Sequence, residues 1–283
     1  MSLSIGQAII SGAAMLLDSG ISEPRLDAGS LVAHVLKRDR TFIIAHPEFV
    51  LTADEAERYE QFVSRRARGE PLQYITGYQE FYGFGFEVNS DVLIPRPETE
   101  SIVEAAVEIL RERQKPLIAD IGTGSGCLAI SLLKLIPDAE AVAADLSPDA
   151  LAVAQRNAER HNVSERLRLS QSDCFSNLEG LAPFTLIVSN PPYVPDAELG
   201  DLQREVRCEP LRALAGGRDG FDLIRRLLHE APRFLKPAGH FIFEIGFGQG
   251  QSIGSLIEPK VWELLEIRND LQGIPRTVVL RKS

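Results

Sequence analysis

The sequence between residues 117 and 127 is Leu117-Ile-Ala-Asp-Ile-Gly-Thr-Gly-Ser-Gly-Cys127. It predicts a short buried strand, Leu117–Ile121, that turns through three glycines into a helix, Cys127–Leu135. Glycines let the backbone turn tightly and approach a ligand, and the start of the helix offers free N–H groups. Because Cys127 follows Gly126, the dinucleotide-binding pattern Gly-x-Gly-x-x-Gly does not fit; the pattern is Gly-x-Gly-x-Gly, preceded by Asp120.

Strands and helices alternate through the rest of the chain. We expect further strands at Ala141–Ala144, Leu167–Ser170, Phe184–Ser189, His240–Ile245, Trp262–Arg268 and Arg276–Leu280. We expect helices at Pro148–His161, with Ser147 or Asp145 as its cap, at Asp219–Leu235 and near Gln249–Ile257. Repeated β–α units predict an α/β fold, a parallel sheet wound with helices on both faces. Ligands of such sheets bind beyond the carboxyl ends of the strands.

The first ninety residues have a different pattern. Apolar residues at helical spacing begin at Ile5, a second helix is expected at Pro24–Arg38, and a third starts with a capping box, Thr52 with Glu55, and runs to about Arg68. The aromatic-rich stretch from Tyr78 to Val88 is broken by glycines and predicts a β-hairpin, packed by its own rings or used for docking. A linker is expected at Val92–Ser101. The resulting division is a helical domain at 1–77, hairpin and linker at 78–95, and the α/β domain at 96–283.

Composition narrows the class of protein. The chain has 283 residues, enough for two domains, with 40 acidic and 30 basic side chains and a net charge of −10. Lys and Arg are not clustered along the sequence, which argues against strong non-specific nucleic-acid binding. Three scattered cysteines indicate neither disulfides nor zinc, and no signal peptide or membrane-spanning run is recognised. We therefore expect a cytoplasmic protein that does not bind membranes.

Asp145 stands at the end of the second predicted strand, 19 residues after Gly126. A carboxylate at that place can accept hydrogen bonds from two ribose hydroxyls, and it disfavours a 2′-phosphate. The alternative is a plain strand-to-helix turn with a capping Asp. The glycine loop alone is weak evidence; loop and acid together favour a nucleoside site.

A second cluster follows the strand Phe184–Ser189 and reads Asn190-Pro-Pro-Tyr193. Two prolines make the backbone rigid where the strand ends. The Asn190 side-chain oxygen and the Pro191 carbonyl can then act as two acceptors for a planar –NH₂ group, which has two donors. Tyr193 supplies an aromatic wall. The alternative is a turn that only ends the strand.

These clusters resemble methyltransferases that use S-adenosylmethionine to methylate planar amide or amine nitrogens. Other stretches narrow the resemblance to the release factor glutamine methyltransferase family, also called PrmC or HemK. They are Gly69-Glu-Pro-Leu-Gln-Tyr-Ile-Thr-Gly77, Ile94-Pro-Arg-Pro-Glu-Thr-Glu100, Glu205-Val-Arg-Cys-Glu-Pro-Leu-Arg-Ala-Leu-Ala-Gly-Gly-Arg-Asp-Gly220 and Phe243-Glu-Ile-Gly246. The resemblance covers essentially the whole chain. It implies a Rossmann-like class I methyltransferase domain with a seven-stranded, mostly parallel sheet. In the sequence this domain follows the small helical domain at 1–77, which the resemblance implies is a substrate-docking domain.

The resemblance also implies roles for single residues. The cofactor would be lined by Gly122, Thr123, Gly124, Ser125 and Gly126, with Asp145 on its ribose and Asn190 beside it. Cys174 would border the adenine where relatives often carry Trp, with Phe175 as a replacement surface. Asn190 and Pro191 would be catalytic, and Asn190, Pro191, Pro192 and Tyr193 would bind the substrate. Arg96 either precedes a helix that starts at Pro97 or belongs to a lid over the pocket, whereas Glu244 and Gln249 are interpreted as structural.

The implied activity is methylation of the glutamine amide nitrogen in the Gly-Gly-Gln loop of class I peptide chain release factors. S-adenosyl-L-methionine would be the donor and S-adenosyl-L-homocysteine the product, with no metal and with a monomeric enzyme. An adenine-amine DNA or RNA methyltransferase is the alternative, because the same acceptors suit that –NH₂ group and duplex would require base flipping. The acidic chain argues against it. A catalytically silent module that docks on release factors is a third reading.

Overall fold

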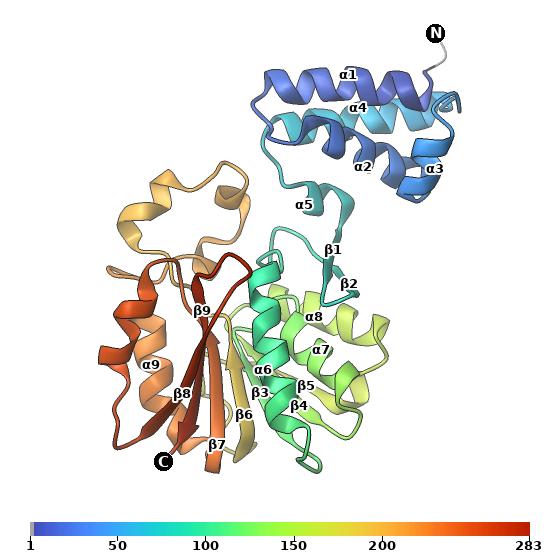
Figure 1. Ribbon diagram of the computed structural model, residues 1–283. Helices are drawn as coiled ribbons and strands as arrows, with labels where there is room; N and C mark the ends of the chain where they lie inside the picture. The colour runs from blue at the N-terminus through green and yellow to red at the C-terminus, as the bar shows by residue number, and fades with distance from the viewer. Residues whose placement is uncertain (1–2) are drawn as a thin grey trace. The chain divides into compact units, whose positions relative to one another are not determined.

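A computed structural model describes residues 3–283, which form two compact units (Figure 1). The first unit takes in the chain up to Tyr78 together with Gln203–Cys208. The second comprises Gln79–Leu202 and Glu209–Ser283. Within residues 3–283, every helix is too short or too polar to serve as a membrane span.

The first unit is a bundle of helices. They are α1 (Ile5–Asp18), α2 (Pro24–Leu36), α3 (Arg40–Ala45), α4 (Ala53–Ala67) and α5 (Leu72–Thr76). Leu16, Leu31 and Tyr59 meet in its core. The expected capping box is confirmed: the Glu55 backbone N–H donates to Thr52 Oγ1 at 3.3 Å, and the Thr52 backbone N–H donates to Glu55 Oε2 at 2.8 Å. Helices α3 and α5 were not expected from the sequence, since neither is long enough to show a periodic pattern.

An ion cluster around the buried Arg66 ties Gln203–Cys208 into this unit. Arg66 is only 3% exposed. Its Nε donates to Asp27 Oδ2 at 2.6 Å, and its Nη2 pairs with Glu205 from the distant segment. Burial raises the pKa of Asp27, although the Arg66 guanidinium acts in the opposite direction. Buried charges need such partners, so the three residues stabilise the unit only as a set.

The expected hairpin pairs β1 (Tyr78–Phe81) with β2 (Phe84–Glu87) and, from Gln79 on, belongs to the second unit. Tyr82 and Gly83 form its turn, with φ of 51° and 73°. Positive φ at both central residues is the hairpin geometry that matches strand twist. Phe81 and Phe86 are buried, which confirms that rings of the hairpin pack into the core.

The second unit is built on a seven-stranded sheet, as expected. Its strands are β3 (Leu117–Ile121), β4 (Glu140–Asp145), β5 (Leu167–Gln171), β6 (Phe184–Ser189), β7 (Leu235–Glu244), β8 (Trp262–Asn269) and β9 (Pro275–Lys282). Their order is β5-β4-β3-β6-β7-β9-β8, with β9 antiparallel to both of its neighbours and the other pairs parallel. The carboxyl ends of β3 to β6 therefore meet at one edge, and the chain has the class I methyltransferase fold.

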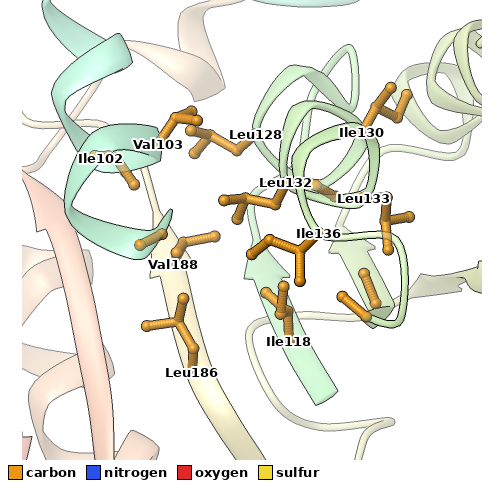
Figure 2. Packing of buried hydrophobic residues seen from close by; sticks show 14 of the residues in the cluster. Ile102, Val103, Ile118, Leu128, Ile130, Leu132, Leu133, Ile136, Leu186 and Val188 are labelled. Atoms are coloured by element: carbon orange, nitrogen blue, oxygen red, sulfur yellow. The ribbon is translucent and has the colours of Figure 1, made fainter. Parts of the chain in front are cut away.

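Helices cover both faces of this sheet (Figure 1). They are α6 (Glu100–Leu110), α7 (Cys127–Leu135) and α8 (Pro148–Arg160) on one face and α9 (Asp222–Glu230) on the other. Figure 2 shows Ile118 of β3 and Val188 of β6 packed against side chains of α6 and α7. The neighbouring Ala119 and Ile187 face the layer of α9, because successive strand residues point to opposite sides.

Three local expectations were wrong. Val92–Ser101 is not linker throughout: a 3-10 turn, η1 (Pro97–Thr99), leads into α6, whose apolar face is buried. The helix expected at Asp219–Leu235 is shorter, because Pro232 lacks a backbone N–H and a 3-10 turn follows Glu230 before β7 begins. Instead of a helix near Gln249–Ile257 there are two 3-10 turns, Gln249–Gln251 and Ile253–Leu256, in a glycine-rich stretch.

Candidate active site

The glycine loop leaves β3 along a path that only glycine adopts easily. Gly122, Gly124 and Gly126 have φ of 76°, 54° and 83°. A Cβ at Gly122 or Gly124 would meet no protein atom within 4 Å, whereas at Gly126 it would lie 2.9 Å from Ile130 Cδ1. The first two glycines thus leave open room beside the loop, and the third allows α7 to pack closely.

Asp120, in β3, stabilises this loop through hydrogen bonds. Its Oδ2 accepts from Thr123 Oγ1 at 2.6 Å and from the Ala129 backbone N–H of α7 at 3.2 Å. Asp120 is fully buried, and burial raises its pKa to about 7. Among the described residues no group hydrogen-bonds its Oδ1. The acid before the glycines is therefore a helix cap that keeps one unused acceptor.

Asp145 ends β4 and holds the loop from the other side. Its Oδ2 accepts from the Gly124 backbone N–H and its Oδ1 from the Ser147 backbone N–H, both at 2.9 Å. Ser147, rather than Asp145, caps α8, since its Oγ accepts from the Ala150 N–H at 3.3 Å. A carboxylate has about four acceptor positions. Two of them remain for a ligand in the pocket that Asp145 lines.

This pocket lies at the carboxyl ends of β3 to β6. Of the residues expected at the cofactor, it is lined by Gly122, Thr123, Gly124, Ser125, Asp145, Cys174 and Asn190. Pro192 lines it too, whereas Gly126, Pro191 and Tyr193 do not. Leu93, Pro95 and Leu146 add apolar wall. The sequence offered no distinctive signal for Leu93 and Leu146, whereas Pro95 belongs to Ile94–Glu100, one of the stretches that carry the family resemblance.

Cys174 lines the pocket, with φ of 50°, and is 7% exposed. Burial raises the pKa of its thiol to about 11, so the thiol stays protonated at neutral pH. Phe175 does not replace a missing ring in the pocket. It is buried and stacks on Phe234, with ring centroids 4.6 Å apart.

Asn190 is held by a residue that the sequence interpretation left without a role. Its Nδ2 donates to Thr99 Oγ1 at 3.0 Å, and Thr99 also lines the pocket. Thr99 Oγ1 donates in turn to Glu244 Oε2 at 2.6 Å. The Tyr193 hydroxyl donates to the other oxygen of Glu244 at 3.0 Å. The only sequence signal for Thr99 was its place within Pro-Arg-Pro-Glu-Thr-Glu.

Glu244 ends β7 and is 1% exposed. Burial raises its pKa to about 7, although its hydrogen bonds with Thr99 and Tyr193 act to lower it. Burial likewise raises the pKa of Tyr193 well above its usual range, so this hydroxyl keeps its proton. In its ionised form, Glu244 thus accepts hydrogen bonds from two hydroxyl groups that belong to different segments of the chain.

Two further side chains brace the loops around the pocket. Gln249 Oε1 accepts from the Gly246 N–H at 2.7 Å, and its Nε2 donates to the Tyr193 carbonyl at 3.1 Å. Arg96 pairs with the buried Glu209, which also accepts from the Ile94 N–H at 3.1 Å. Pro210 beside Glu209 lines the pocket, as does Pro95 beside Arg96.

The chain matches known proteins along most of its length. The family model of the PrmC N-terminal domain matches residues 7–77, and that of the methyltransferase small domain matches residues 102–215. A release factor glutamine methyltransferase of Koribacter versatilis (strain Ellin345) is 42% identical over 281 residues, covering 99% of both chains. One from Geobacter sulfurreducens is 44% identical over 264 residues, covering 93% of this chain and 91% of the other. The crystal structure of the ribosomal protein L11 methylase from Lactobacillus delbrueckii subsp. bulgaricus shares the fold, with a TM-score of 0.52, 19% identity and coverage of 73% and 91%.

Proposed function

The chain belongs to the release factor glutamine methyltransferase family, and from that premise we propose the reaction that its pocket performs. It transfers a methyl group from S-adenosylmethionine to the side-chain amide nitrogen of the glutamine in the Gly-Gly-Gln motif of class I peptide chain release factors. The observation that carries the proposal is the Asn190 side-chain amide, which lines the pocket. Its Nδ2 is engaged by Thr99, which leaves Oδ1 as an acceptor for a substrate N–H.

The residues of the pocket fit the methyl donor. Asp145 has two acceptor positions left for a ribose diol, and the room beside Gly122 and Gly124 is open. The apolar wall that includes Leu146 and Cys174 suits a purine ring. When bound, S-adenosylmethionine supplies a methyl group on a positively charged sulfur, which keeps the electron pair of the broken bond.

The difficult part of the reaction is the nucleophile. The lone pair of an amide nitrogen is delocalised into its carbonyl, so this nitrogen attacks weakly. Asn190 Oδ1 and the Pro191 carbonyl would accept its two N–H groups and orient the nitrogen. They would also stabilise the positive charge that develops on it, as preorganised dipoles do in a site that excludes water. The methylated amide then gives up one proton readily, so no strong base is required.

The test is a methyl-transfer assay with labelled S-adenosylmethionine. Three substrates are offered separately: native release factor, the same factor with its Gly-Gly-Gln glutamine changed to alanine, and DNA. We expect label on the native factor alone, at the glutamine side chain. Label on DNA would instead support the adenine-amine reaction, and equal label on the alanine variant would overturn the assignment of the methylated atom.

A further inference from the structure

We propose that Thr99 and Glu244 are positioning residues that fix which way the Asn190 side-chain amide faces. The inference rests on the proposed function, since it assumes that Asn190 Oδ1 receives the substrate amide. The two ends of an Asn side chain have almost the same shape but opposite hydrogen-bonding character. Reversing the amide would present an NH₂ group to a substrate that needs an acceptor, so its orientation decides whether the site works.

The hydrogen bonds form a chain with a direction. It runs from Asn190 Nδ2 to Thr99 Oγ1 at 3.0 Å and from Thr99 Oγ1 to Glu244 Oε2 at 2.6 Å. Above its pKa of about 7, Glu244 is ionised and only accepts, so in that state the single hydroxyl proton of Thr99 is committed to Glu244. Thr99 can then only accept from Asn190, which requires the NH₂ end of the amide. Asn190 Oδ1 is thereby left for the pocket.

The hydrogen-bond chain is shielded from water at its Thr99–Glu244 end, which sets its direction. Thr99 and Glu244 are 2% and 1% exposed, so solvent does not readily replace either partner. They come from separate elements, η1 and β7, and the Thr99 backbone is itself held by its N–H bond to the Arg96 carbonyl at 3.1 Å. The Tyr193 hydroxyl occupies the second oxygen of Glu244 at 3.0 Å. Every member is anchored, which is the condition for a polar network to specify one geometry.

The charges that face Glu244 come from three directions. Arg276 of β9 favours its ionised form, whereas Glu98 of η1 opposes it, and the Thr99 and Tyr193 hydroxyls donate to the carboxylate. A neutral side chain at this position would lose the directing effect. A glutamine, for example, can donate its NH₂ to Thr99, and the Thr99 hydroxyl is then free to donate to Asn190 Oδ1. The amide of Asn190 would reverse.

The experiment compares Thr99→Val, Thr99→Ser and Glu244→Gln with wild type, with Thr277→Val as matched control. Thr277 is also fully buried, but its hydroxyl forms a hydrogen bond with Ser101 and takes no part in the hydrogen bonds that link Asn190, Thr99 and Glu244. Turnover and KM are measured with release factor, affinity for S-adenosylhomocysteine by calorimetry, and melting temperature alongside. We expect Thr99→Val to lower kcat about ten- to a hundredfold, the effect of misdirecting one hydrogen bond in the site, with cofactor affinity unchanged. Glu244→Gln should lower kcat in the same way, and Thr99→Ser should stay within about threefold of wild type.

An equal loss of kcat in Thr277→Val, or wild-type kcat in Thr99→Val, would overturn the inference. A readout that needs no substrate separates it from the proposed function. The side-chain NH₂ signal of Asn190, assigned by its disappearance in Asn190→Ala, should exchange slowly with solvent in wild type and faster in Thr99→Val. Protected NH₂ protons without methylation of release factor would uphold the orientation and overturn only the function. Unprotected protons in wild type would overturn the orientation itself.

Discussion

Replacing Asp145 by alanine tests the nucleoside end of the pocket. The structure sets the size of the effect: two of four acceptor positions are used by Gly124 and Ser147, and two remain for the ribose hydroxyls. A hydrogen bond to a charged group contributes about 1.5–3 kcal/mol. Two such bonds amount to about 3–6 kcal/mol, so we expect the Kd to rise roughly 10²- to 10⁴-fold.

The assay is calorimetric titration with S-adenosylhomocysteine, which binds without reacting. Asp138→Ala is the matched control. Asp138 stands before the other end of β4, is exposed, and likewise accepts a backbone N–H, from Lys115 at 2.9 Å. We expect this variant to bind as wild type does. A Kd for Asp145→Ala within about threefold of wild type would refute the ribose assignment, provided that the variant melts cooperatively.

Three further predictions concern the site and its supports. Asn190→Ala should lose roughly 10²–10³ in turnover, as when one preorganised group is removed, with a much smaller change in S-adenosylhomocysteine affinity; near-normal turnover would contradict its role. Gly126→Ala should lower the free energy of unfolding by about 2 kcal/mol, since its φ is 83° and the new Cβ crowds Ile130, whereas Gly124→Ala should chiefly weaken S-adenosylhomocysteine binding. Thermal melting measures the first effect and calorimetry the second. Equal S-adenosylhomocysteine binding by both variants would argue that the open space beside Gly124 is not the ligand site. Burial raises the pKa of Asp120 from 3.8 to about 7, so the folded state keeps a proton that the unfolded chain loses near pH 4. The free energy of unfolding should therefore fall as the pH rises from about 4 to about 7. Urea titrations at pH 5 and 7 should show this fall in wild type and a smaller one in Asp120→Asn.

The sequence predicted best where apolar runs meet strong stop signals. β3 ends at its glycines and β6 ends at Asn190-Pro-Pro, and both strands have the bounds expected from the sequence. The start of α4 followed from a capping box, which is a local interaction. Errors arose where a helix-like pattern was interrupted by Pro232 or by closely spaced glycines, since these residues convert α-helix to 3-10 turns.

The site was predictable to the extent that it is local. Strand order brings the glycine loop next to Asp145, and Rossmann-type topology dictates that proximity. The hydrogen-bond chain Asn190–Thr99–Glu244 was not predictable, because both of its hydrogen bonds are long-range in sequence. The partners of one are separated by 91 positions and those of the other by 145 positions. Such pairs depend on side-chain placement in the finished core, so Glu244 was interpreted only as a structural residue.

The return of Gln203–Cys208 to the first unit affects how this protein can be recombined. A single crossover near residue 78 would bring in a foreign helical unit but keep the resident Glu205. A foreign helical unit without an arginine at position 66 would leave Glu205 without its ion-pair partner. A foreign unit that has this arginine would still need Glu205 to pair with it. Residues 27, 66 and 205 should therefore be inherited together, although residue 205 lies 139 positions after residue 66. A chimaera that transplants residues up to 78 together with 203–208 should fold better than one that transplants the first segment alone.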